Sequence, residues 1–182
     1  MSEAIENAYV VEWWGPYTDE QLEEIEDRAD SGSLYIISGL RKYQRGNPKI
    51  QYIGISERGA IVRFHDKGHP GKNVVRERRY WLAHLSNLQQ EATRANLELV
   101  EHALIYTCKT EINKKKKGRV PKTPVVVINR WFTKNGNYRE KRTTPVQLVV
   151  PDVILYDGRR FWTCERLKYC PSLSPDAELL QY

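Results

Sequence analysis

The chain has 182 residues, 40% of them hydrophobic, and a formal net charge of +6. That length fits one domain with elaborations, or one domain with a small appendage, and it is enough to bury a core. No apolar run approaches the ~20 residues that a membrane span requires, and the first residues lack the basic and apolar stretches of a secretory signal. The odd count of three cysteines argues against a disulfide framework. We therefore expect a soluble, cytoplasmic protein with no membrane contact.

Charge is segregated along the chain, which divides it into three segments. Residues 1–31 carry ten acidic residues and one basic residue, a net of −9, whereas residues 32–113 carry thirteen basic and seven acidic residues, a net of +6. Residues 114–182 carry fifteen basic and six acidic residues, a net of +9. We expect an acidic N-terminal segment, a core and a basic C-terminal extension with these bounds. Such segregation favours nucleic acid as the partner of the last two-thirds of the chain.

The first predicted elements are a strand and a short helix. Strand-like residues at 8–11 run into an aromatic turn at 12–17. Thr18 and Gln21 then have the spacing of a capping box, which predicts that a short helix begins there. The acidic residues of that helix are expected to face solvent.

Two short strands are predicted next, at about Ser33–Ser38 and Ile50–Ile55. Residues 39–48 between them contain the Gly, Asn and Pro that end one strand and begin another, together with several positive charges. Adjacent antiparallel strands would hold the hydroxyls of Tyr35 and Tyr52 close together, beside this basic turn.

A short helix is predicted over Gly59–Phe64, a third strand near Arg78–Ser86, and a long helix over Asn87–Cys108. Glu101 lies two residues past Leu99, one of the apolar residues that recur at threes and fours in this helix. We therefore expect its carboxylate to stand to one flank of the apolar stripe, at the rim of a cleft; a surface ion pair is the plain alternative.

Past Lys114 the pattern changes to strands. Apolar runs at Val125–Ile128 and Val146–Val150, with turn signals at Asn135-Gly136 and Asp157-Gly158, predict a β-rich C-terminal extension.

The order of these pieces resembles the GIY-YIG endonuclease family. The first motif reads SLY at residues 33–35, so only its tyrosine matches, whereas the second motif, YIG at residues 52–54, is complete. Arg63 follows nine residues later, near the position of the family's catalytic arginine. Glu101 matches the family's metal-binding glutamate on a helix, and Asn113, twelve residues further on, matches its trailing asparagine.

The resemblance implies an α+β fold with a GIY-YIG-like core, a small and mainly antiparallel three-stranded sheet flanked by helices. It also implies the chemistry. Mg²⁺ (or Mn²⁺) needs hard oxygen ligands and can be bound through one carboxylate, so Glu101 alone suffices. Tyr52 or Tyr35 would contact the attacking water or act as the base. Arg63 fits as a fork-shaped donor to the non-bridging phosphate oxygens, and Asn113 supports the helix end near Glu101.

The partner of the base is left open by the sequence. In this family a histidine often follows the arginine by four residues, but that position is Lys67 here, with His65 and His69 two residues to either side. We favour His69, because its Gly-His-Pro-Gly loop can point freely; Lys67 is the alternative, and His65 is expected to lie on the surface.

Basic residues gather around the expected site. The run of four lysines and an arginine at 114–119 is either a clamp on the phosphate backbone or a solvated loop tip. The residues expected to bind nucleic acid are Arg41, Lys42, Lys67, Lys114, Lys115, Lys116, Lys117 and Arg119.

The sequence thus predicts a magnesium-dependent endonuclease that cuts double-stranded DNA, of a restriction or phage type, and a homodimer where both strands are cut. A catalytically inactive nucleic-acid-binding protein with the same fold and an RNA-directed nuclease are the alternatives.

Overall fold

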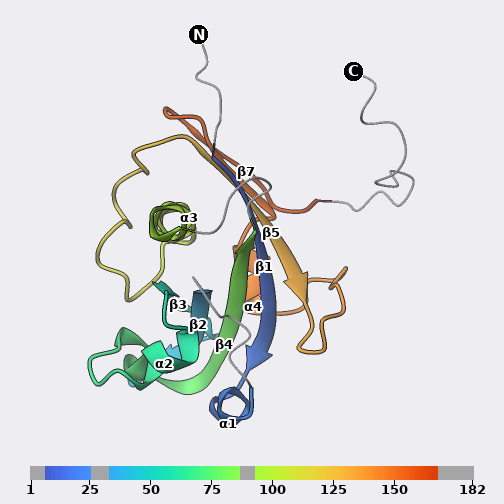
Figure 1. The fold of residues 1–182 in the computed structure, drawn as a ribbon. Coiled ribbons are helices and arrows are strands. Elements are labelled where there is room, and N and C mark those ends of the chain that lie inside the picture. The colour runs from blue at the N-terminus through green and yellow to red at the C-terminus, as the bar shows by residue number, and fades with distance from the viewer. Residues whose placement is uncertain (1–6, 26–32, 87–92, 168–182) are drawn as a thin grey trace.

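The computed structural model describes residues 7–25, 33–86 and 93–167, whose strands join in one seven-stranded sheet of order β3-β2-β4-β1-β5-β6-β7 (Figure 1). The strands are β1 (Ala8–Tyr17), β2 (Ser33–Arg41), β3 (Lys49–Ser56), β4 (Val74–Ser86), β5 (Val125–Phe132), β6 (Val153–Tyr156) and β7 (Phe161–Cys164). The helices are α1 (Asp19–Glu23), α2 (Ala60–His65), α3 (Arg94–Cys108), α4 (Pro145–Val149) and the short 3₁₀ helix η1 (Pro70–Asn73).

The prediction of a small three-stranded sheet flanked by helices is wrong. The expected strands β2, β3 and β4 are present and antiparallel, but they form one end of a larger mixed sheet. The N-terminal strand β1 lies between β4, to which it is antiparallel, and β5, to which it is parallel (Figure 1). This pairing gives the free edge of β4 a hydrogen-bonding partner and joins all three charge segments in one sheet. The C-terminal strands therefore enlarge the main sheet.

The sheet curls around α3 into a half-barrel. Helix α3 packs against β3 at one end of the sheet and against β5 and β6 at the other, and Figure 1 shows it cupped by the strands. Its buried side chains meet three tryptophans from β1, β4 and β5: Trp13 stacks on Trp131 at 5.8 Å between ring centroids, and the edge of Trp81 meets Trp131 at 5.1 Å. Burial of each large apolar side chain contributes about 1.5–3 kcal/mol to folding, which makes this cluster the main core.

A second cluster lies on the opposite face of β2, because β2 is buried on both sides. Leu34 and Ile36 face the main core, whereas the alternate residues Tyr35 and Ile37 face α1 and α2 and pack with Ala60. The strand that carries the first tyrosine is therefore held rigidly from both faces.

Local signals account for the ends of several elements. The capping box of Thr18 and Gln21 begins α1 as predicted. Thr93 caps α3, and residues 87–92 of the predicted long helix lie outside the described residues. The turn at Asp157-Gly158 joins β6 to β7, which confirms that hairpin.

The strand predicted at Val146–Val150 is wrong, because those residues form α4. Thr144 caps this helix in a capping box with Gln147, and Pro145 occupies the first turn, where its missing N–H does no harm. Its buried Val146 joins the main core. The valines at 146, 149 and 150 favour a strand by composition, and a helix of five residues is too short to show a helical period.

In the part of the chain that the structure describes, every helix is too short or too polar to cross a membrane. Cys108 and Cys164 are free thiols.

Candidate active site

The two predicted tyrosines face one another across neighbouring strands. Tyr35 on β2 lies opposite Gly54 on β3, and Tyr52 lies opposite Ile37, so both rings are on the same face of the sheet. Their ring centroids are 6.0 Å apart. Gly54 makes this approach possible: a Cβ atom there would lie 2.5 Å from the hydroxyl oxygen of Tyr35 and 2.7 Å from Cε1 of Tyr52. The third letter of the YIG motif is therefore required by the packing of the two rings.

The tyrosines differ in access to solvent. Tyr35 is fully buried, in edge-on contact with Phe64 at 4.9 Å, whereas Tyr52 is partly exposed and lines an open cleft. Burial raises the pKa of Tyr35, and the neighbouring Tyr52 adds to this. Only the Tyr52 hydroxyl is placed to meet a substrate, with Tyr35 behind it.

His69 is fixed by two hydrogen bonds. The backbone N–H of Gly71 donates to Nδ1 at 3.0 Å, so the neutral ring carries its proton on Nε2, 2.9 Å from the Tyr35 hydroxyl oxygen. The Nε2–H group therefore donates to Tyr35. Burial lowers the pKa of His69 to about 4, and the positive charge of Arg63 contributes. The expectation of a freely pointing His69 that takes up a proton is thereby corrected: the imidazole is a held, neutral donor.

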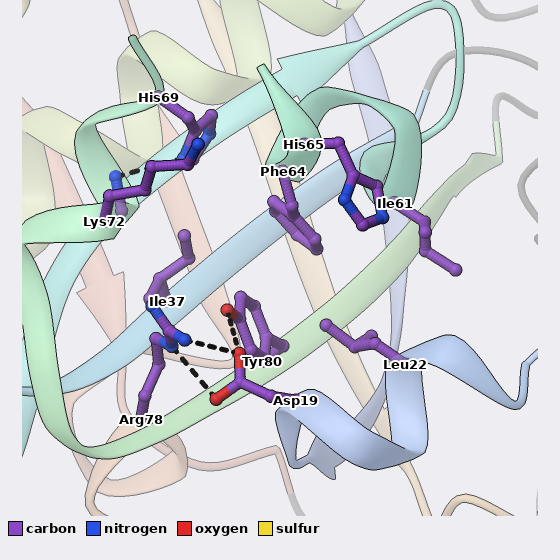
Figure 2. Close-up of a pocket in the computed structure, with 11 residues that line it drawn as sticks. Asp19, Leu22, Ile37, Ile61, Phe64, His65, His69, Lys72, Arg78 and Tyr80 are labelled. Carbon is purple, nitrogen blue, oxygen red and sulfur yellow. Dashed lines mark hydrogen bonds and ion pairs between the residues drawn. The ribbon is translucent and has the colours of Figure 1, made fainter. Parts of the chain in front are cut away.

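The other two candidates near Arg63 lie away from the tyrosine pair. Figure 2 shows a smaller pocket, about 240 Å³, whose lining includes His65 on one side and His69 on the other. At its far wall Asp19 accepts hydrogen bonds from Tyr80 at 2.8 Å and from Arg78. Lys67 is exposed and lines neither this pocket nor the cleft. Of the three, only His69 contacts the tyrosines.

Arg63 projects from the last turn of α2 into the cleft. It forms an ion pair with Asp66, three residues on, which also pairs with Arg58 at 3.3 Å. The hydrogen bond to Asp66 raises the pKa of Arg63, and the guanidinium in turn lowers the pKa of both tyrosines against the effect of burial. Asp66 was not among the predicted site residues, although its spacing from Arg63 within one helical turn is the signal that could have identified it.

Glu101 comes from α3, on the other side of the edge strand β3. It lies on the buried face of the helix with Leu97, Val100 and Leu104, so the predicted position to one flank of the apolar stripe is corrected. Its side chain is 11% exposed and its Oε2 accepts a hydrogen bond from the Lys116 ammonium at 2.5 Å. Burial raises the pKa of Glu101, and Lys116 offsets part of that shift. Negative charge on Glu101 raises the pKa of Tyr52, which shows that the two groups share one electrostatic environment.

Asn113 closes the free edge of β3 between these groups. Its Nδ2 donates to the carbonyl of Ile53 at 2.8 Å, and its Oδ1 accepts from the N–H of Ile53 at 2.9 Å. The N–H of Ile112 likewise donates to the carbonyl of Gln51 at 2.8 Å. The side chain thus acts as one more residue of a neighbouring strand, and its role is to brace the edge.

Tyr52, Arg63, Glu101 and Asn113 all line one open cleft of about 700 Å³. A second groove, about 630 Å³, shares Lys114 with the cleft and continues it to the turn after β2. The basic residues that line the two are Arg41, Lys42, Arg63, Arg94, Lys114, Lys115 and Lys116. Arg94, which pairs with Glu98 at 2.8 Å, had not been predicted.

The loop after α3 is anchored at several points. Lys109 donates to the carbonyl of Lys117 at 3.1 Å, and His102 donates from Nε2 to the carbonyl of Arg119 at 2.7 Å. Lys117 and Arg119 line neither the cleft nor the groove, whereas Lys114 and Lys115 do and are exposed. The predicted basic clamp is therefore divided, with its first three lysines at the site.

A divalent metal ion is compatible with Glu101. The described residues contain no group of three or more histidine, cysteine, aspartate or glutamate side chains placed to hold a metal. Mg²⁺ does not require one, because it retains several waters and is often bound through one or two carboxylates together with substrate phosphates. A buried carboxylate at the wall of an open, basic cleft supplies that kind of ligand.

No family model matches the chain, and no curated protein or solved structure matches it either. The inference of function therefore depends on the site itself.

Proposed function

We propose that this protein is a magnesium-dependent endonuclease that hydrolyses phosphodiester bonds in double-stranded DNA. One observation carries the proposal: Tyr52, Arg63 and Glu101, which lie on three different elements, line the same cleft. Their order along the chain is that of the GIY-YIG motifs.

Each group in the cleft has a function in phosphodiester hydrolysis. The Arg63 guanidinium can donate to two non-bridging oxygens at once, and Asp66 keeps it charged and oriented. A divalent ion held by Glu101 would neutralise charge on the phosphate and stabilise the leaving oxygen. Tyr52 lies at the wall of the cleft, where its hydroxyl can orient or deprotonate the attacking water.

A relay of donors supports negative charge on Tyr52. His69 donates to Tyr35, so the proton of Tyr35 is available for Tyr52, and a hydrogen bond from Tyr35 lowers the pKa of Tyr52. Burial and the charge of Glu101 act in the opposite direction and leave that pKa raised. A cation on Glu101 would weaken the second of these effects and so favour proton loss from Tyr52, which links the base to the carboxylate.

The groove lined by Arg41, Lys42 and Lys114 supports a duplex partner, because it extends the cleft with positive charge along a line that a phosphate backbone could follow. We place the protein in the cytoplasm, in keeping with its free thiols, and assign it a restriction or phage type of setting, with a homodimer where both strands are cut.

The ion pair of Glu101 with Lys116 is the observation that favours a second candidate, a nucleic-acid-binding protein without turnover. If the Lys116 ammonium stays on the Glu101 carboxylate, that carboxylate does not bind a metal ion and the cleft binds nucleic acid without cutting it.

Nicking of a supercoiled plasmid separates these functions. We expect wild type to nick DNA in Mg²⁺ or Mn²⁺ and to stop in EDTA. Glu101→Gln should bind the plasmid but leave it uncut, whereas Glu140→Gln, an exposed glutamate that lines neither the cleft nor the groove, is the control and should cut normally. Binding without any cleavage under either metal would refute the enzyme and favour the second candidate. Faster cleavage of RNA than of DNA, offered side by side, would reassign the substrate.

A further inference from the structure

The ammonium of Lys116 is paired with the carboxylate of Glu101, the expected metal ligand. Its Nζ lies 2.5 Å from Oε2 of Glu101 and 3.3 Å from the backbone carbonyl of Glu98. The Lys116 side chain is 27% exposed and the Glu101 side chain 11%, so the pair sits at the wall of the cleft and remains open to it.

The backbone is anchored on both sides of Lys116, and the path of the loop between these anchors brings the Lys116 ammonium to the Glu101 carboxylate. Three residues before it, Asn113 is bound to the edge of β3, and directly after it the carbonyl of Lys117 accepts from Lys109. Lys116 itself has a φ of +67°, a left-handed conformation that a side-chain-bearing residue adopts only when its surroundings impose it.

The neighbouring lysines provide the contrast. Lys114 and Lys115 line the same cleft and are exposed, and neither forms an ion pair within the described residues. Replacement of Lys115 therefore removes the same charge from the same cleft as replacement of Lys116 but leaves the contact with Glu101 in place.

We propose that Lys116 is a built-in counterion of Glu101, which excludes divalent cations from that carboxylate until a phosphate backbone in the cleft draws the ammonium away. The proposal rests on the function proposed above and adds its regulation. The ammonium on Oε2 neutralises the charge of the Glu101 carboxylate, so Lys116 and a divalent ion compete for it. Phosphate oxygens beside Lys116 offer it an equivalent partner, and Glu101 is then free to bind the metal.

The consequence is coupling between metal and nucleic acid at one site. Coupling between two ligands is reciprocal, and typical couplings change affinity about 5- to 150-fold. Duplex should tighten metal binding, and metal should tighten duplex binding by the same factor, and this factor should be larger when Lys116 can exchange partners than when its ammonium is absent. Such coupling would keep the carboxylate from binding metal unproductively in the absence of substrate.

The test measures Mn²⁺ binding to the full chain by electron paramagnetic resonance of free Mn²⁺, at constant ionic strength, with and without a 20-base-pair duplex of phosphorothioate DNA as the probe. For wild type we expect weak Mn²⁺ binding that duplex tightens at least about 5-fold. Lys116→Gln should bind Mn²⁺ more tightly than wild type without DNA, and duplex should tighten its Mn²⁺ binding by a smaller factor than in wild type. Lys115→Gln should retain the wild-type coupling.

Two further variants keep the result interpretable. Lys116→Arg preserves a cation on Glu101 and should retain the coupling, whereas Glu101→Gln should lose Mn²⁺ binding in both conditions. Wild-type affinity and coupling in Lys116→Gln, or no Mn²⁺ binding at Glu101 in any variant, would overturn the proposal. Plasmid cleavage by the same samples reports separately on the enzyme: cleavage that persists when the coupling is absent refutes the exchange of Lys116 and leaves the nuclease in place.

Discussion

Replacement of Gly54 by alanine tests whether the close approach of the two tyrosines is needed for both folding and chemistry. The added Cβ would lie 2.5 Å from Cζ and the hydroxyl oxygen of Tyr35, whereas ordinary contacts lie at 3.4–4 Å. One of the rings must therefore move by about 1 Å. Tyr35 is fully buried, and it contacts Phe64 at 4.9 Å and His69 at 5.7 Å between ring centroids, so it has no free space to enter.

Overpacking of this kind destabilises a core by about 1–3 kcal/mol. A displacement of about 1 Å at a reacting group reduces turnover about 100-fold. Urea unfolding followed by tryptophan fluorescence gives the first quantity, and plasmid nicking well below the unfolding transition gives the second. Gly118→Ala is the matched control, because no atom lies within 4 Å of its added Cβ. If the free energy of unfolding of Gly54→Ala lies within about 0.5 kcal/mol of the wild-type value and the variant nicks at the wild-type rate, the packing argument fails.

Three further predictions concern the groups around the tyrosines. Burial lowers the pKa of His69 to about 4 in the folded protein, against 6.5 in the unfolded chain, so the unfolded chain takes up a proton first as pH falls. The stability that depends on neutral His69 is fully present above pH 6.5 and falls by up to about 3 kcal/mol toward pH 4. Urea melts of wild type and His69→Gln measure this loss, because the titration of Glu and Asp cancels in the difference between the two proteins. Equal pH slopes for the two proteins would contradict this. Asn113→Ala removes both hydrogen bonds to Ile53 and should destabilise the chain by about 1–3 kcal/mol in thermal melts. Thr110→Val, which removes only the hydrogen bond from Thr110 to Asn113, should have a milder effect. No change in Asn113→Ala would show that the edge of β3 is closed in another way. Arg63→Lys keeps the charge but loses the fork, so nicking should fall about 100-fold or more with duplex affinity nearly unchanged, and a variant as fast as wild type would remove Arg63 from the phosphate.

Local sequence signals predicted the parts of the fold that depend on neighbouring residues. The strands that carry Tyr35 and Tyr52, the capping box at Thr18 and the hairpin at Asp157-Gly158 all follow from patterns a few residues long. The pairing of β1 with β5 could not be predicted in the same way, because Ala8 meets Val126 across more than half of the chain and nothing local in either strand specifies the other. Together with the pairing of β1 with β4, it joins the three expected strands to β5, β6 and β7 in one seven-stranded sheet.

In the candidate site, too, some features could be predicted from the sequence and others could not. The resemblance to the GIY-YIG motifs is what grouped Tyr52, Arg63 and Glu101 in one expected site, whereas the helical period alone put Glu101 on the flank of the apolar stripe and not on its buried face. Hydrogen-bond partners depend on loops and could not be predicted: the direction of the bond between His69 and Tyr35 is set by the N–H of Gly71, and the counterion of Glu101 is set by the path of the loop after α3.

That loop links the fold to the site more directly than the motifs do. Asn113 binds the edge of β3 one residue from Gly54, and Lys116, three residues further on, binds Glu101. One short segment therefore holds both the strand that carries Tyr52 and the counterion of Glu101, whose charge adds to the effect of burial in raising the pKa of Tyr52. Asn113 and Lys116 lie on the same short stretch of backbone. Lys116 can therefore move to a phosphate without disturbing Asn113 only if the residues between them absorb the change. Lys114 and Lys115, exposed and without ion pairs among the described residues, are the positions free to do so, and binding of the same backbone by their ammonium groups would favour that movement.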